Sequence, residues 1–173
     1  MKTPLVLLSA LAIATPSKRL DFLDEYIKQS YVLDLEQPIT QALHRVEDAP
    51  GEPWLLVLDI DETAISNLSW LREVKYNTSL EAFEQYAPKG QGVAIMAVKR
   101  LYDAAIERGY PVVFMTGRDQ RFANVTRMLL HKNGYRAWND LFFKEDRSIP
   151  TWRYKRDHRC QLQDKGYSII NVG

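Results

Sequence analysis

The sequence predicts an α/β fold, a Rossmann-like parallel sheet with helices on both faces. Short apolar runs bounded by turn residues occupy 54–58, 111–115 and 167–172, and such runs are typical of strands that are covered on both faces. Segments with apolar residues at helical spacing separate them, and a shorter strand is expected at 141–144. This alternation of strands and helices is the pattern of a parallel sheet.

The start of the chain predicts a secretory signal peptide over residues 1–14. Residues 1–3 carry one positive charge, residues 4–14 are almost wholly apolar, and small residues precede Thr15. A basic start, an apolar core and a small-residue cleavage site are the features of secreted or periplasmic proteins. We expect cleavage after Ala14, because the apolar run is shorter than the roughly 20 residues of a membrane span. The alternative is a buried first element of a cytosolic domain.

Residues 15–53 are expected to form an N-terminal helical segment. Apolar residues recur at three- and four-residue spacing from residue 18 onward. Pro38 is expected to interrupt this helix and to begin a second short one that reaches Val46. The turn-forming residues 48–53 then separate the segment from the first strand.

The α/β domain is expected over residues 54–173, with helices at 93–108, 120–133 and 151–165. An insertion at about 64–93 follows the first strand and has less regular spacing, and we expect it to be partly helical. It contains four scattered aromatic residues: Trp70, Tyr76, Phe83 and Tyr86. Their rings could stack on a nucleoside base, but packing within the insertion's own core is the favoured interpretation.

The composition argues against two classes of binding partner, nucleic acids and acidic membranes. Of the 173 residues, 46% are hydrophobic and 26% are charged, which are globular values. Lys plus Arg is 23 and Asp plus Glu is 22, giving a net charge of +1. A chain so balanced has no overall field for nucleic acid or acidic membranes. A single cysteine excludes an intrachain disulfide. The oligomeric state stays open.

Two carboxylates, Asp59 and Asp61, directly follow the first predicted strand. Ligands of open α/β sheets bind at the carboxyl ends of the strands. One carboxylate at such a position can act as a nucleophile and the other can transfer a proton. Together their oxygens suit Mg²⁺. The alternative is an acidic turn that caps the next helix.

Two further segments offer groups for an anion. Thr116, Gly117 and Arg118 follow the second strand, where a hydroxyl, a glycine and a helix start can bind an oxyanion. A capped helix start is the alternative for this segment. Lys155, near the start of the last predicted helix, can neutralise the remaining charge of a phosphoryl group, although most lysines are solvated. Lys155 and Arg118 would then face the acidic residues 59–62.

These segments, taken in order, resemble the acid phosphatase branch of the haloacid dehalogenase (HAD) superfamily. The resemblance rests on L-D-I-D-E-T-A-I-S-N over 58–67, V-F-M-T-G-R over 113–118, Y-K at 154–155 and G-Y at 166–167. That branch groups bacterial class B and C acid phosphatases with plant acid phosphatases and vegetative storage proteins. It implies an HAD-type fold and a secreted or periplasmic, Mg²⁺-dependent phosphomonoesterase acting on small molecules such as nucleotides or sugar phosphates.

The resemblance also implies a role for each matching residue. Asp59 corresponds to the nucleophile that forms an aspartyl-phosphate, and Asp61 corresponds to the general acid/base. Asp59 and the backbone carbonyl of Asp61 would bind Mg²⁺. Thr116, with Gly117 beside it, and Lys155 would bind the phosphate.

One feature departs from the family. The family continues into an acidic motif, G-D-x-x-x-D, that completes the Mg²⁺ site, and here the motif would begin at Gly173. We therefore expect a truncated phosphatase domain that lacks the C-terminal part of the fold and the remaining acidic ligands. The alternative function is a catalytically impaired or non-enzymatic storage or binding relative. Phosphoryl transfer between nucleosides and sugars would use the same residues.

Overall fold

The computed structural model describes residues 22–23, 25–26, 31–48 and 53–173. The predicted signal peptide, residues 1–14, lies outside the described residues. The chain divides into two compact units, Met1–Pro38 and Ile39–Gly173, and the second contains the whole sheet. Within the described segments, no helix is long and apolar enough to cross a membrane.

The central sheet has four parallel strands in the order β5-β4-β1-β6. Their bounds are β1 (Trp54–Leu58), β4 (Val112–Asp119), β5 (Asp140–Lys144) and β6 (Ser168–Val172). Leu58, the last residue of β1, pairs with Phe114 on one side and Val172 on the other. The carboxyl ends of β1 and β6 therefore meet at one edge, and β4 continues beyond them.

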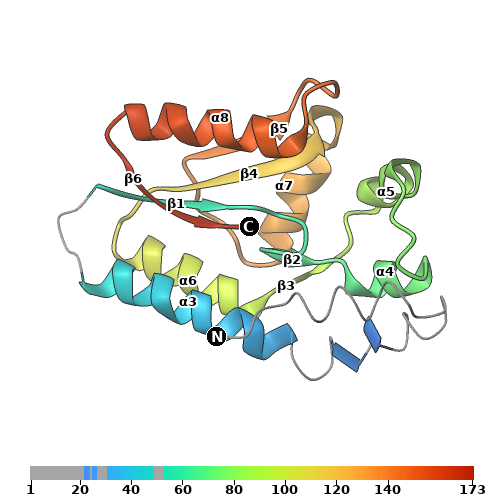
Figure 1. Cartoon of the computed structure of the whole chain (residues 1–173), viewed down its shortest axis with the longest axis horizontal. Helices are drawn as coiled ribbons and strands as arrows, with labels where there is room; N and C mark the ends of the chain where they lie inside the picture. Colours follow the sequence, from blue (N-terminus) through green and yellow to red (C-terminus); the bar gives the residue numbers. More distant parts are fainter. Residues whose placement is uncertain (1–21, 24, 27–30, 49–52) are drawn as a thin grey trace. The chain divides into compact units, whose positions relative to one another are not determined.

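Three helices connect the strands: α6 (Met96–Glu107), α7 (Ala123–Lys132) and α8 (Thr151–Asp164). The connections from β1 to β4 and from β4 to β5 run one way across the sheet, and the connection from β5 to β6 returns. Because such connections are right-handed, α6 and α7 cover one face and α8 covers the other. Figure 1 shows α6 and α8 on opposite faces.

Both faces of the sheet are packed, which explains the continuous apolar runs. Leu55, Val57, Val113 and Met115 form a buried cluster with Tyr154 and Leu162 of α8. On the other face, the Phe114 ring lies 5.5 Å from that of Tyr135 and 6.4 Å from that of Tyr102 of α6. Burying each large apolar side chain contributes about 1.5–3 kcal/mol.

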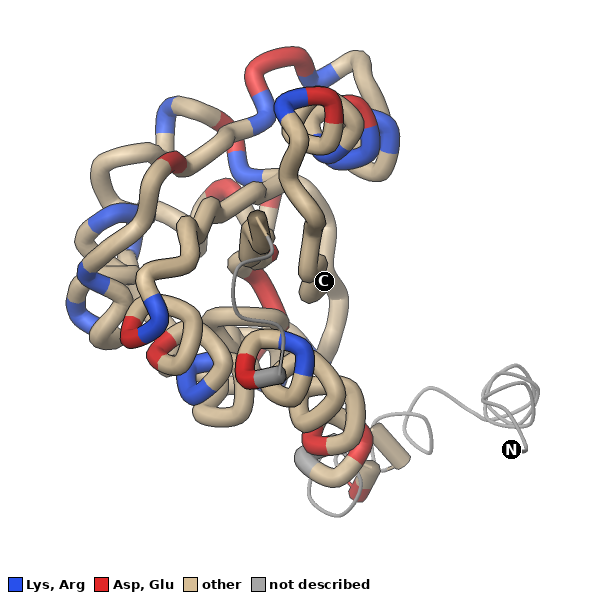
Figure 2. Tube along the Cα trace, turned by 90° about the vertical axis from the view of Figure 1, so that its left-hand side faces the viewer, with Lys and Arg blue, Asp and Glu red and all other residues tan. Residues whose placement is uncertain are grey.

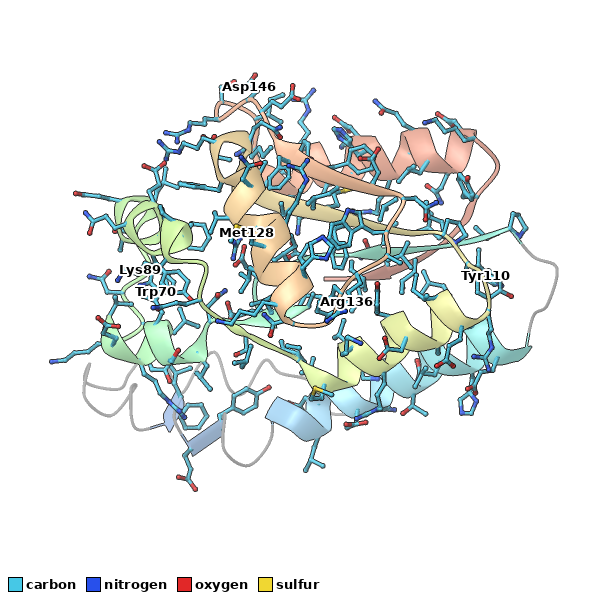
Figure 3. The ribbon with its side chains drawn as sticks, turned by 180° about the vertical axis from the view of Figure 1, so that it is seen from behind. Trp70, Lys89, Tyr110, Met128, Arg136 and Asp146 are labelled. Carbon is cyan, nitrogen blue, oxygen red and sulfur yellow. The ribbon has the colours of Figure 1, made fainter. Side chains whose placement is uncertain are left out.

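The insertion after β1 is closed by a small antiparallel pair of strands. Ile65 pairs with Ala94 and Ser66 pairs with Val93. The insertion contains β2 (Ile65–Ser66), α4 (Leu68–Glu73), α5 (Leu80–Tyr86), the short 3-10 helix η1 (Ala87–Lys89) and β3 (Val93–Ala94). Trp70 of α4, which is labelled in Figure 3, stacks on Tyr86 of α5, with ring centroids 4.5 Å apart, and meets Phe83 edge-on. These rings pack the insertion's own core.

Three expected boundaries were wrong. Helix α3 (Tyr31–Asp48) continues through Pro38, because burial of Ile39 and Val46 in the second unit offsets the missing backbone hydrogen bond. The helix expected from Val93 begins at Met96, since Val93 and Ala94 pair in β3. The second strand does not end at Met115 but continues as β4 to Asp119, and a 3-10 helix, η2 (Gln120–Phe122), precedes α7.

Charged residues of both signs are mixed along the described chain. Figure 2 shows Lys and Arg interspersed with Asp and Glu on the second unit. This distribution agrees with the near-zero net charge of +1. Strong electrostatic features of this unit are therefore local pairs of opposite charge.

Candidate active site

Asp59 and Lys155, far apart in the sequence, form an ion pair. Asp59 follows β1 directly, and its backbone N–H donates to the carbonyl of Val172 at 3.0 Å, which fixes it between β1 and β6. Lys155 lies in the second turn of α8, and its Nζ is 2.8 Å from Oδ2 of Asp59. The side chains are 14% and 19% exposed for Lys155 and Asp59. The pair is thus shielded from most of the solvent that would weaken it.

The protonation of Asp59 depends on two opposing effects. Burial raises the pKa of the Asp59 carboxyl above its usual value, and the nearby Asp61 adds to the rise. The charge and hydrogen bond of Lys155 lower the same pKa, without cancelling the effect of burial. Lys155 therefore favours the ionised carboxylate that a nucleophile requires.

Asp61 is bound by a buried arginine from β4. Arg118 Nε donates to Asp61 Oδ2 at 3.0 Å, and Arg118 Nη2 donates to Oδ1 at 2.7 Å. The Arg118 side chain is 1% exposed, and its Nη1 donates to the hydroxyl of Thr126 in α7 at 3.2 Å. Such a bidentate, charge-assisted pair holds a carboxylate in one orientation.

The chain turns sharply between Asp59 and Ile65. Glu62 has a φ of 53°, a left-handed conformation that is uncommon for residues other than glycine. Its carboxylate accepts hydrogen bonds from the backbone N–H of Asn67 at 2.7 Å and from Asn67 Nδ2 at 2.9 Å. Burial raises the pKa of Glu62, and the hydrogen bonds from Asn67 oppose this rise. These bonds stabilise the turn that presents Asp61.

Thr116 and Gly117 lie in strand β4, so the helix start expected at these residues is wrong. The strand continues because Asp119 pairs with Lys144 of β5. Asp119 then caps η2 by accepting from the backbone N–H of Arg121. Thr116 is fully buried, and its Oγ1 accepts from the backbone N–H of Arg118 at 3.1 Å.

Gly117 permits the close approach of helix α8. A Cβ atom at this position would lie 2.9 Å from Cγ2 of Thr151, the first residue of α8. Thr151 and Lys155 are four residues apart and therefore lie on the same side of the helix. The absence of a side chain at Gly117 thus helps to place Lys155 against Asp59.

A cavity of about 430 Å³ opens between Asp61 and the insertion. Asp61, Glu62 and Asn67 line one side, and residues of α4, α5 and the loop between them line the other, namely Trp70, Leu71, Thr78, Ser79, Leu80 and Phe83. This volume lies within the usual range for small-molecule sites. A smaller cavity is lined by Gly117 and Arg118 among others. Phe83 lines both cavities.

The described residues offer a small set of ligands for a divalent metal ion. Asp59 offers a carboxylate and Asp61 a carbonyl oxygen, both hard ligands of the kind that Mg²⁺ takes. Within the described ranges, no three His, Cys, Asp or Glu side chains gather as a metal site. Mg²⁺ often takes only one or two carboxylates, together with water and substrate phosphate, and Asp59 meets that smaller requirement.

The sequence did not predict four of the contacts at this site. They are Arg118 with Asp61, Asn67 with Asp61, Asn67 with Glu62, and Tyr86 with Asn67. Arg118 was expected only to face the acidic residues. Asn67 is the last residue of the D-E-T-A-x-S-N segment, and its place in that motif is the sequence feature that could have indicated its role at the site.

Comparisons with known proteins show which family this chain resembles in sequence. A sequence model of the HAD superfamily, subfamily IIIB (acid phosphatase), matches residues 9–173. Acid phosphatase 1 of Solanum lycopersicum is 24% identical over 166 residues, covering 90% of this chain and 64% of that protein. The stem 28 kDa glycoprotein of Glycine max is 28% identical over 167 residues, covering 91% and 65%. The chain thus spans less than two thirds of the length of these curated relatives.

A solved structure shares the fold. The class C acid phosphatase from Bacillus anthracis superposes with a TM-score of 0.73 at 13% identity, covering 90% of this chain and 67% of that one. A second structure of that enzyme, with tungstate bound, gives a TM-score of 0.66. The predicted α/β fold of HAD type, with a parallel sheet between helices, is confirmed.

Proposed function

Because the chain belongs to subfamily IIIB of the HAD superfamily, the acid phosphatases, we propose that it hydrolyses phosphomonoesters through an aspartyl-phosphate on Asp59. One observation carries this proposal. Asp59, at the carboxyl end of β1, is ion-paired with Lys155 at 2.8 Å. A shielded carboxylate kept next to a cation at this edge can attack phosphorus while the cation neutralises the phosphoryl oxygens.

The proposed reaction has two steps. In the first, an Asp59 carboxylate oxygen bonds to phosphorus, the bond from phosphorus to the leaving oxygen breaks, and Asp61 gives that oxygen a proton. In the second, water attacks phosphorus, Asp61 takes a proton from the water, and phosphate leaves as Asp59 is regenerated. Asp61 thus alternates between acid and base, as a positioned carboxyl can.

The remaining predicted residues support the transferring phosphoryl group. Lys155 supplies positive charge, and Thr116 and Gly117 lie on β4, the neighbouring strand, beyond the residue that pairs with the end of β1. Asp59 and the Asp61 carbonyl would hold Mg²⁺. A bound Mg²⁺ would neutralise phosphoryl oxygens and orient the ester. The cavity between Asp61 and the insertion would take the leaving group, whether a nucleoside or a sugar.

We further propose that the protein is secreted or periplasmic, on the pattern of residues 1–14. N-terminal sequencing of the protein recovered from outside the cytoplasm tests this. A mature chain that begins just after Ala14 is expected, and an intact Met1 in the cytoplasmic fraction would contradict it.

The test of the reaction is the Asp59→Asn substitution in the full chain, with p-nitrophenyl phosphate and Mg²⁺. We expect a loss of more than about 100-fold in kcat, because the nucleophile is removed. Acid-quenched wild type should carry a phosphate adduct on Asp59 by mass spectrometry. Asp164→Asn, at the far end of α8, is the matched control and should keep full activity.

Two outcomes would contradict this function. Retained activity in Asp59→Asn would exclude the aspartyl-phosphate mechanism. A folded wild-type chain that binds phosphate and hydrolyses no ester would favour the alternative, a non-enzymatic binding relative.

A further inference from the structure

We propose that Tyr86 and Asn67 are positioning residues that hold the Asp61 carboxyl for proton transfer at its Oδ2 atom. The hydroxyl of Tyr86 donates to Asn67 Oδ1 at 3.1 Å, and Asn67 Nδ2 donates to Asp61 Oδ1 at 2.8 Å. This chain of bonds runs from the insertion to the residue assigned as acid and base. The inference rests on the proposed function and names residues that the family resemblance did not assign.

The hydrogen bonds around Asp61 single out one oxygen for the proton. Among the described residues, Oδ1 accepts two bonds, from Arg118 Nη2 and Asn67 Nδ2, whereas Oδ2 accepts one, from Arg118 Nε. An ionised carboxylate offers about four acceptor positions, so three are occupied and the remaining one lies on Oδ2. Asp61 keeps 27% of its side chain exposed, so the carboxyl group is not closed off from the cavity that it lines.

Asn67 can hold Asp61 only if its amide group points one way. Nδ2 faces two carboxylates, Asp61 and Glu62, at 2.8 and 2.9 Å. A flipped amide would turn its oxygen toward both carboxylates, and each would lose its hydrogen bond from Nδ2. Tyr86 donates to Oδ1, so its hydroxyl favours the productive orientation. Asn67 is 1% exposed and Tyr86 2% exposed, and bonds so shielded from water retain more of their strength.

The Tyr86 ring belongs to the aromatic core of the insertion. The Tyr86 ring stacks on Trp70 with an angle of 13° between the planes. Trp70 and Phe83 also line the cavity next to Asp61 and Asn67. A leaving group in that cavity would therefore contact the residues that hold the Tyr86–Asn67–Asp61 chain. The insertion would thus influence both substrate fit and proton transfer.

The test uses Tyr86→Phe, which keeps the ring and removes the hydroxyl. A general acid matters most for a poor leaving group and least for a good one. We expect kcat/KM for an alkyl phosphate to fall about tenfold or more, while kcat/KM for p-nitrophenyl phosphate falls less than about threefold. Tyr102→Phe is the matched control, because it loses a buried hydroxyl that bonds to the Ala137 carbonyl elsewhere, and should spare both esters.

A double-mutant cycle with Asn67→Ala separates positioning from general damage. Once Asn67 is removed, Tyr86→Phe should have no further effect on alkyl phosphate hydrolysis. Equal losses on both esters, or full additivity of the two substitutions, would overturn the proposal. Asp61→Asn distinguishes this failure from that of the proposed function: if Asp61→Asn itself spares alkyl phosphates, Asp61 is not the acid.

Discussion

Lys155 Nζ lies 2.8 Å from Asp59 Oδ2, so a helix on one face of the sheet is joined by charge to the end of its central strand. The two residues are separated by most of the second unit in sequence. Their pairing places a positive charge where a phosphoryl group bonded to Asp59 would carry its negative charge.

Lys155→Met removes the charge and keeps most of the side-chain length. We expect kcat/KM for p-nitrophenyl phosphate to fall by about 100-fold or more, because transition-state charge loses its partner. Steady-state kinetics on the full chain measures this. Lys165→Met, at the exposed end of α8, should change little. A loss of less than about threefold in Lys155→Met would contradict an electrostatic role.

Gly117→Ala should disturb the active site through Thr151. The added Cβ would lie 2.9 Å from Thr151 Cγ2 and would push the first turn of α8, with Lys155 one turn later, away from β4. We expect a lower kcat, and we expect Thr151→Ser in the same chain to restore it, because serine lacks Cγ2. Failure of that second substitution to rescue activity would show that Gly117 acts in another way.

Asp119 should make stability depend on pH and salt. Its carboxylate accepts from the backbone N–H of Arg121 and bonds to Arg147 Nε at 2.8 Å, and these contacts lower the pKa of Asp119. The stability from a lowered pKa is present above the unfolded value of 3.8 and is lost as pH falls through the folded value. Asp119→Asn should therefore reduce Tm at neutral pH and not in strong acid.

Salt offers an independent check of the same contacts. Arg147 also bonds to Glu84 of α5 at 2.7 Å, and its side chain is 52% exposed. Exposed pairs are screened by added salt, so Arg147→Gln should lower Tm less at high salt than at low salt. Equal effects of Arg147→Gln at both salt concentrations would contradict an electrostatic link between α5 and the loop after β5.

Trp70 should be a major source of stability for the insertion. It is 7% exposed and packs on Phe83 and Tyr86. Truncating a buried tryptophan costs about 3–5 kcal/mol, so Trp70→Ala should lower the free energy of unfolding by about that amount in denaturant titrations. Trp152→Ala, at 63% exposure, should cost less than about 0.5 kcal/mol. Similar costs at both positions would refute this assignment.

The sheet could be predicted because its strands are apolar on both faces. Leu55 and Leu56 point to opposite faces of the sheet and are each 1% exposed. The apolar run that contains them is also too short to be read as a helix. The Asp59–Lys155 pair was also predictable, since both residues belong to segments that resemble one family. Strands of two residues, such as β2 and β3, are too short to give a periodic signal.

Contacts between polar residues that are far apart in the sequence could not be predicted from the sequence. Arg118 and Asp61 are 57 residues apart, and no local pattern indicates that an arginine in a strand is buried. Tyr86 looked like one of several scattered aromatic residues, whereas its hydroxyl bonds to Asn67. Pro38 illustrates the opposite error, since the burial of Ile39 and Val46, which favours a continuous helix, is invisible to local propensity.

The β2–β3 pair has a consequence for how such proteins diversify. Because Ile65 lies beside Ala94 and Ser66 beside Val93, the two ends of the insertion are held side by side in the β2–β3 pair. Doubling the length of a segment closed in this way costs only about 0.6 kcal/mol in chain entropy. A change in the length of segment 68–91 should therefore leave the pairing of the main sheet intact. The contacts of Tyr86 with Asn67 and of Glu84 with Arg147 limit which changes the fold can accept.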